Sequence, residues 1–213
     1  MKKNLTELVF IMDRSGSMSG LEKDCVGGFN SMIKKQKKED GECLVSTVLF
    51  NNSDTILHDR VSLKDIRQMK EEDYVPSGCT ALIDALGNSI RHISDVHRYI
   101  RKEDNPEHTI FIITTDGLEN ASKKYSSEEV KKMVEQKKEE GWEFIFLAAN
   151  IDAVETAKKY GINEDRAMNY VSDEVGTMTN FNVLDKMIRK FRKCGCVAEN
   201  WAEEINEDYR NRS

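Results

Sequence analysis

Oxygen-bearing side chains follow an apolar run near the start of the chain. Asp13, Ser15 and Ser17 stand at alternate positions after residues 8–12, which read Leu-Val-Phe-Ile-Met. The run has no polar face and predicts a buried strand, so the three side chains would lie just past its carboxyl end. Carboxylate and hydroxyl oxygens are the ligands that a hard cation such as Mg²⁺ takes. Gly16 relieves the backbone, which lets the loop wrap tightly around something small.

Two later segments carry oxygens that we expect at the same place. Residues 109–115 form a second apolar strand pattern that runs into Asp116, and Thr80 follows a Pro- and Gly-containing loop at residues 76–79. In a doubly wound sheet, ligands bind at the carboxyl ends of the strands, where the strand order reverses. The two acid-ended strands would be neighbours there, within reach of the loop. The combined set offers two carboxylates and three hydroxyls: Asp13, Ser15, Ser17, Thr80 and Asp116. Mg²⁺ prefers near-octahedral oxygen geometry, so water or a partner would complete this set.

A simpler interpretation treats these side chains as helix caps. Ser15 and Ser17 would cap the first helix, and Thr80 would cap the helix expected at residues 80–100. Asp116 would cap a helix of its own. Caps are common, so each residue alone fits this interpretation. All five together fit it poorly.

Strand and helix patterns alternate along the chain. Strands are expected at residues 8–12, 43–50, 55–61, 109–115, 142–149 and 166–171, and helices at residues 20–39, 62–69, 80–100, 126–140 and 153–160, with a last helix from Thr177 or Thr179 to residue 191. The short turn at residues 51–54 makes the third strand antiparallel and places it at the sheet edge. We take His58, within it, as an exposed strand residue. The alternation predicts an α/β fold with a doubly wound, mostly parallel six-stranded sheet, one antiparallel edge strand and helices on both faces.

Length and composition narrow the classes of protein. The 213 residues suffice for one large domain, which we expect over residues 1–196. Residues 197–213 would be a tail or a short helix of that domain, which either packs through Trp201 and Ile205 or frays. With 32 basic and 38 acidic residues the net charge is −6, which argues against nonspecific nucleic-acid binding. No apolar run has the length of a membrane span, and the amino-terminal residues lack a signal-peptide pattern.

The cysteines predict free thiols in a reducing cytoplasm, because they are odd in number and form no CxxC pair. They are Cys25, Cys43, Cys79, Cys194 and Cys196. The closely spaced pair at residues 194 and 196 is of a type that binds metal or responds to redox conditions, but no matching Cys/His pair lies near it in the sequence.

The residues of the three loops resemble a known signature. Residues 13–17, Asp-Arg-Ser-Gly-Ser, match the DxSxS motif of von Willebrand factor A domains. Residues 78–80 resemble the family's second-loop threonine and residues 114–117 its third-loop aspartate, and the similarity runs from about residue 5 to 171 or beyond. The resemblance implies a Rossmann-like fold with a metal-ion-dependent adhesion site. It also implies that Asp13, Ser15, Ser17, Thr80 and Asp116 are the ligands of a divalent cation, most simply Mg²⁺, with Mn²⁺ or Ca²⁺ as alternatives.

The resemblance favours a metal-dependent protein-binding module whose partner supplies an acidic residue to the cation. Without a secretion signal or second domain, the chain looks like a stand-alone bacterial-type intracellular member that binds a cytoplasmic protein partner, with no nucleic acid and no membrane.

The rival interpretation is a Mg²⁺-dependent phosphatase-like hydrolase with Asp13 as nucleophile. Phosphatases of the haloacid-dehalogenase type, which this arrangement also resembles, need a second acid two residues later, and Ser15 stands there. No lysine is convincingly placed to neutralise a phosphoryl group. We therefore expect a binding protein rather than an enzyme.

Overall fold

The central sheet has six strands in the order β3-β2-β1-β4-β5-β6 in the computed structural model, which describes residues 1–213. The strands are β1 (Lys2–Asp13), β2 (Glu42–Phe50), β3 (Asp54–Ser62), β4 (Pro106–Thr115), β5 (Trp142–Ala148) and β6 (Ala167–Asn169). All neighbours are parallel except β2 and β3, which pair antiparallel. The order reverses between β1 and β4. This is the predicted doubly wound sheet with one antiparallel edge strand.

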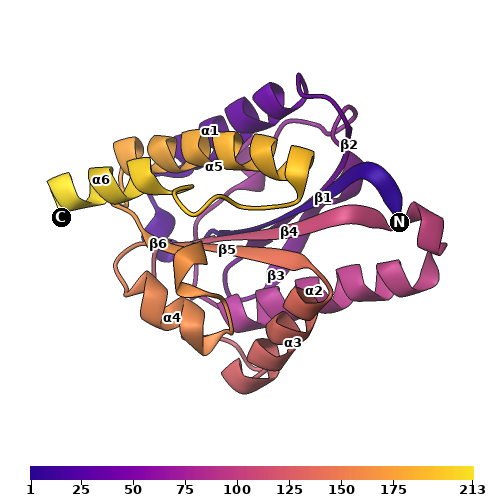
Figure 1. Ribbon diagram of the computed structural model, residues 1–213. Helices are drawn as coiled ribbons and strands as arrows, with labels where there is room; N and C mark the ends of the chain where they lie inside the picture. The colour runs from indigo at the N-terminus through magenta and orange to yellow at the C-terminus, as the bar shows by residue number, and fades with distance from the viewer.

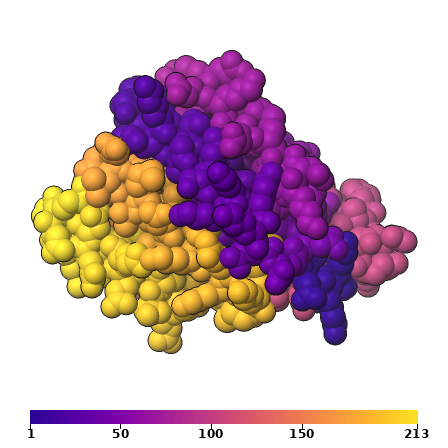
Figure 2. Space-filling view, turned by 90° about the horizontal axis from the view of Figure 1, so that it is seen from above, coloured from indigo at the N-terminus to yellow at the C-terminus, as the bar shows by residue number.

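Helices cover both faces of the sheet (Figure 1). They are α1 (Glu22–Gln36), α2 (Leu82–Tyr99), α3 (Ser127–Glu139), α4 (Ala153–Lys159), α5 (Glu174–Cys194) and α6 (Glu203–Arg212). Helices α1, α5 and α6 lie over one face, and α2, α3 and α4 over the other. Figure 2 shows the yellow α6 against the orange α5, with the indigo-to-purple region of α1 beside them. No helix combines the length and apolar character needed to cross a bilayer.

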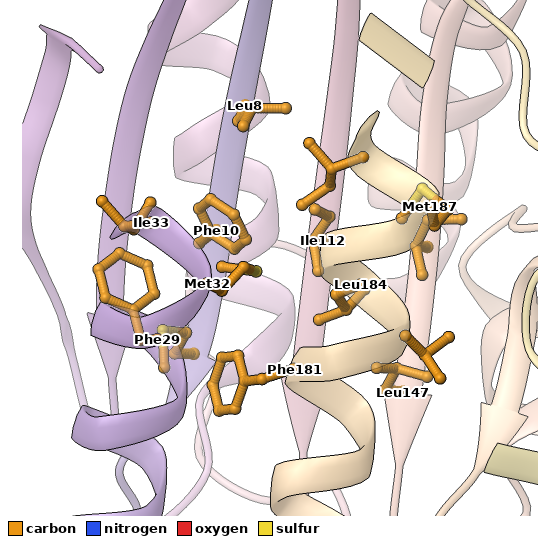
Figure 3. Packing of buried hydrophobic residues seen from close by; sticks show 14 of the residues in the cluster. Leu8, Phe10, Phe29, Met32, Ile33, Ile112, Leu147, Phe181, Leu184 and Met187 are labelled. Atoms are coloured by element: carbon orange, nitrogen blue, oxygen red, sulfur yellow. The ribbon is translucent and has the colours of Figure 1, made fainter. Parts of the chain in front are cut away.

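Residues 8–12 of β1 are all apolar because this part of the strand contributes to both cores. Leu8 and Phe10 belong to the core beneath α1 and α5, whereas Val9 and Ile11 belong to the core beneath α2 and α3. Figure 3 shows the first of these cores, in which Phe10 meets Phe29 of α1 edge to face, with ring centroids 5.4 Å apart. A strand buried on both faces has no polar side, which explains its continuous apolar run.

Helices α1 and α5 pack closely because α1 has a glycine at the contact. A Cβ atom at Gly28 would lie 2.2 Å from the Phe181 ring of α5. At the other end of the pair, buried Arg192 donates to Gln36 O (2.9 Å) and Gly41 O (3.1 Å), which satisfies carbonyls where α1 ends.

The edge strand β3 is irregular. Its register with β2 shifts on either side of Thr47, and Arg60 has a φ of 48°. His58 is 4 % exposed rather than solvated as predicted: its Nδ1 lies 3.0 Å from Thr47 Oγ1 and its ring stacks on Phe29. The irregular register turns this side chain toward the core, which the alternation pattern alone does not show.

Residues 62–69 do not form the predicted helix. After β3 the chain makes a turn and continues without regular structure to residues 71–73. Lys37 Nζ donates to Lys64 O (3.1 Å) and Ile66 O (3.0 Å). The Asn30 side chain accepts from the N–H of Met69 and donates to its carbonyl. Side chains of α1 and of Lys37, which directly follows it, therefore bind backbone groups that a helix would use internally, and only one turn forms, at Ser62 O.

Two boundaries near the carboxyl terminus also differ from the prediction. Helix α5 begins at Glu174 rather than at Thr177 or Thr179, because Asp173 Oδ1 accepts from Gly176 N (2.8 Å) and caps it. Strand β6 is shorter than the expected residues 166–171. Beyond α5, Trp201 and Ile205 are 9 % and 1 % exposed, and Trp201 Nε1 donates to Asp165 O (2.9 Å).

Candidate metal site

The first loop begins where β1 ends, at Asp13. Ser15 N donates to Asp13 Oδ1 (2.7 Å), and Ser15 Oγ lies 3.1 Å from Ser17 Oγ. Asp13 and Ser15 are each 1 % exposed, whereas Ser17 is exposed. Helix α1 has Leu21 at its N-cap position, with no side-chain capping bond. The serine hydroxyls of this loop are therefore turned toward each other and do not cap the helix.

The third loop meets the first across the point where the strand order reverses. Ser17 Oγ donates to Asp116 Oδ1 (2.5 Å), and Thr115 Oγ1 donates to Asp13 Oδ2 (2.6 Å). The parallel register of β1 with β4, in which Met12 lies opposite Thr114, brings the two loops together. The next helix begins only at residue 127, so Asp116 is not a cap.

Thr80 lies beside the same group. A Cβ atom at Gly117 would be 3.9 Å from Thr80 Oγ1 and 3.8 Å from Ser17 Oγ, so both hydroxyls border this glycine. Thr80 is 4 % exposed, and the N-cap position of α2 is held by Ala81. The structure thus brings together all five predicted residues, and none of them serves the helix-cap role of the simpler interpretation.

The loop of Thr80 is fastened to the third loop by reciprocal hydrogen bonds. Thr80 N donates to Asn120 Oδ1 (2.9 Å), and Asn120 N donates to Thr80 O (3.0 Å). Glu119 Oε2 accepts from Ile83 N (2.9 Å) in the first turn of α2, and Asp84 accepts from Lys124 N (2.9 Å). These contacts fix the threonine relative to Asp116. Sequence reasoning missed them because their partners are about 40 residues away and follow no local pattern.

The second loop also contacts the first through its backbone. Gly16 N donates to Gly78 O (3.0 Å), and Ser77 N donates to Arg14 O (3.0 Å). Gly78 has a φ of 72°, a left-handed conformation that glycine adopts without strain. Tyr74, 1 % exposed, donates its hydroxyl to the main-chain carbonyl of Asp13. The sequence around Tyr74 gave no sign of this positioning role.

The two carboxylates lack a cationic partner. Asp116 is 3 % exposed, nearly as buried as Asp13, and neither forms an ion pair with lysine, arginine or histidine. The neighbouring Arg14 extends away, and its Nη1 and Nη2 donate to Asp73 O (3.2 Å) and Thr55 Oγ1 (2.9 Å). Burial raises the pKa of both acids, partly offset by their hydroxyl donors, and the Asp13 charge raises the pKa of Asp116 further.

This environment fits a divalent cation. Burying a charged group without an opposite charge is unfavourable, and a cation between the two acids would supply that charge. Every donor side chain is an oxygen, the ligand type of Mg²⁺, Mn²⁺ and Ca²⁺. Nowhere does the molecule gather three or more His, Cys, Asp or Glu side chains into a cluster able to hold a metal. The hydroxyls of Ser15, Ser17 and Thr80 would therefore be needed to hold the cation here.

The histidines lie elsewhere. His92 Nε2 is 2.8 Å from Asp59 Oδ1, and His97 Nε2 is 2.5 Å from the buried Glu7. His108 packs edge to face on Phe191. None of them reaches the candidate metal site.

Comparison with known proteins gives structural likeness only. No family model and no curated protein sequence matches the chain. The von Willebrand factor domain of the pili tip protein Mfa5 from Porphyromonas gingivalis superposes with a TM-score of 0.63 at 10 % identity, covering 91 % of this chain and 98 % of that one. Manganese-loaded TRAP protein from Plasmodium vivax gives 0.55 at 17 % identity, covering 85 % and 74 %.

A third similar structure is proximal thread matrix protein 1 from the mussel byssus, described with a zinc-occupied metal-ion-dependent adhesion site. Its TM-score is 0.62 at 17 % identity, covering 86 % of this chain and 46 % of that one, so this chain spans about half of the mussel protein. At these identities the likeness concerns the fold. Together with the strand order, it shows that the chain has the fold of a von Willebrand factor type A domain.

Proposed function

We propose that this chain is a metal-dependent protein-binding module. Its cation would be held by Asp13, Ser15, Ser17, Thr80 and Asp116. The observation that carries the proposal is the pair of buried carboxylates, without a cationic partner, beside three hydroxyl groups. A bound divalent cation supplies the missing positive charge and attracts an acidic side chain of a partner protein. Mg²⁺ is the ion we propose, because every donor is a hard oxygen.

The surroundings of the site support a protein partner. Ser17 is exposed, so the site reaches the surface. Leu118, two residues after Asp116, is 67 % exposed, and Val75, in the loop that contacts residues 14–16, is 57 % exposed. Apolar side chains around a charged centre are typical of protein interfaces, where an apolar patch surrounds a few polar contacts.

The site lacks groups that a hydrolase of this type needs. Ser15 holds the position of the general acid, and its hydroxyl is engaged with Ser17. No lysine or arginine contacts the two carboxylates. We therefore propose binding rather than catalysis, and a cytoplasmic setting in keeping with five free thiols.

Capture of binding proteins from the native cell extract tests this function. Wild-type chain on a resin should retain a set of proteins with Mg²⁺ and release it with EDTA. Asp116→Asn should retain none. Asp152→Asn is the matched control: it removes the same charge from an acid that caps α4, where Asp152 Oδ1 accepts from Glu155 N (2.9 Å), and asparagine caps equally well. It should bind as wild type does.

An unchanged set of bound proteins in EDTA would contradict metal-dependent recognition. The hydrolase alternative is tested separately with an aryl phosphate. Turnover by wild type that Asp13→Asn abolishes would replace the binding proposal with a catalytic one.

A further inference from the structure

Two cysteines lie together at the end of α5, far along the chain from the metal-site loops. Cys194 is the last helical residue, and Gly195 follows with φ 66° and ψ 17°. Cys194 and Cys196 are exposed, whereas Cys25 and Cys43 are buried and Cys79 stands alone in the second loop. Cys194 Sγ lies 3.2 Å from the carbonyl oxygen of Lys190, one helical turn earlier, and 3.5 Å from the carbonyl oxygen of Cys196, so the sulfur sits beside the turn that carries the second cysteine.

The backbone of the turn has the span of a disulfide. The Cα–Cα distance across one residue depends on the φ and ψ of that residue, and left-handed helical angles give about 5.4 Å, the mirror image of the right-handed helix. Disulfides span about 4.4 to 6.8 Å between Cα atoms. The neighbouring Cys194 thiol raises the pKa of the Cys196 thiol. The backbone of the turn therefore places the two cysteines at a separation that a disulfide can span.

The glycine between them is required twice over. Its positive φ favours glycine, and a Cβ atom there would lie 2.2 Å from Cε1 of His108. Gly195 N also donates to Phe191 O (2.7 Å), which ends the helix at this point. The His108 ring and the helix end together hold the turn, so they hold the cysteines at disulfide-forming separation.

We propose that Cys194 and Cys196 form a reversible redox site, which closes to a disulfide on exposure to a low-molecular-weight disulfide. One protein thiol, as thiolate, attacks the external disulfide R–S–S–R, forms a mixed disulfide and releases one R–SH. The second protein thiolate then attacks the protein sulfur of that mixed bond and releases a second R–SH. Two protein thiols are oxidised, one external disulfide is reduced to two thiols, and the two thiol protons go to the released sulfurs.

The position of the pair suits this reversible chemistry. The carboxyl end of a helix carries partial negative charge, which disfavours a persistent thiolate, whereas a disulfide is neutral and escapes that effect. A ring that spans a single residue is small and strained, and strained, exposed disulfides are the readily reduced ones. The site thus closes under oxidising conditions and reopens when the thiol pool recovers.

The test uses glutathione disulfide on the native wild-type chain, followed by acid quenching and peptide mass mapping. Both cysteines lie on one tryptic peptide, residues 194–210, and Cys79 lies on another. We expect peptide 194–210 to lose two hydrogens, and this closed form to exceed the glutathione adduct by about tenfold or more, because the neighbouring thiol acts at mM or higher effective concentration. Dithiothreitol should reverse the change.

Single variants and an internal comparison complete the test. Cys194→Ser and Cys196→Ser should each keep glutathione on the remaining thiol, as Cys79 does in every sample. Glutathione that stays on peptide 194–210 of the wild type, or a disulfide from it to Cys79 or to a second chain, would overturn the proposal. The readout depends on local chemistry alone, so it is independent of the metal-binding proposal.

Discussion

Asp116→Asn is expected to stabilise the metal-free protein and to destabilise the metal-bound one. Asparagine keeps the size of the side chain and an oxygen that can accept from Ser17 Oγ. It removes one of two buried charges that have no counter-charge, so the folded state without metal loses an unfavourable interaction. With metal, the same substitution removes a charged ligand.

The size of the metal effect follows from linkage. Mg²⁺ at 100 times its Kd stabilises a folded protein by about 2.7 kcal/mol. For a chain of 213 residues, 1 kcal/mol shifts Tm by about 2 to 4 °C, so wild type should melt about 5 to 11 °C higher with Mg²⁺ than in EDTA. For Asp116→Asn we expect a shift below about 2 °C. The two melting temperatures should therefore reverse their order between EDTA and Mg²⁺.

Differential scanning calorimetry in EDTA and in a Mg²⁺ series measures both effects, with Asp152→Asn as the control that should follow wild type. A lower Tm of Asp116→Asn in EDTA would refute the argument from uncompensated buried charge. A full Mg²⁺ response in that variant would show that Asp116 is not a ligand.

Four further substitutions test the packing and the loops. Gly28→Ala should lower the free energy of unfolding by about 1 to 3 kcal/mol, because its methyl group would collide with an aromatic ring of α5. Gly27→Ala, with nothing within 4 Å of its Cβ, should stabilise α1 by up to about 1 kcal/mol. Equal urea midpoints for the two variants would contradict this. The hydrogen bond from Arg67 lowers the pKa of Asp73 to about 2, so its stabilisation is present above about pH 4 and is lost as the pH falls toward 2. In an NMR titration Arg67→Ala should move that midpoint up toward about 3.9, and an unmoved midpoint would show that the pair does not interact. Tyr74→Phe leaves the buried carbonyl of Asp13 without its side-chain donor and should lower the free energy of unfolding by about 1 to 3 kcal/mol. Urea unfolding in EDTA measures this effect, and an unchanged midpoint would exclude the role of the hydroxyl.

The fold was predictable where strands are buried on both sides. Residues 8–12 and 109–115 form continuous apolar runs because β1 and β4 lie at the centre of the sheet, and their alternation with helical patterns determines the topology. The meeting of the first and third loops was predictable for a related reason: Asp13 and Asp116 come at the ends of β1 and β4, and parallel strands bring such ends to one edge. The place of Thr80 was not fixed in this way, because it follows a loop rather than a strand.

The remaining features depend on tertiary contacts that local patterns do not record. His58 is buried because an irregular register turns it inward, and residues 62–69 form a turn and irregular chain, not a helix, whose backbone groups bind the side chains of Lys37 and Asn30. The positioning groups Tyr74 and Asn120 act through partners roughly 40 to 60 residues away. The start of α5 is different, because Asp173 is a local capping signal that was visible in the sequence. The prediction placed the start of this helix at Thr177 or Thr179 and so overlooked it.

The hydrogen bond from Ser17 to Asp116 joins residues 99 positions apart, and this has a consequence for biogenesis. During synthesis the first loop leaves the ribosome long before β4 has been made. At about 5 to 20 residues per second, the two halves of the site stay separated for about 5 to 20 s. Metal capture therefore follows sheet assembly and cannot guide its early steps, so an amino-terminal fragment that stops before residue 116 would expose the Asp13 loop without forming the complete donor set.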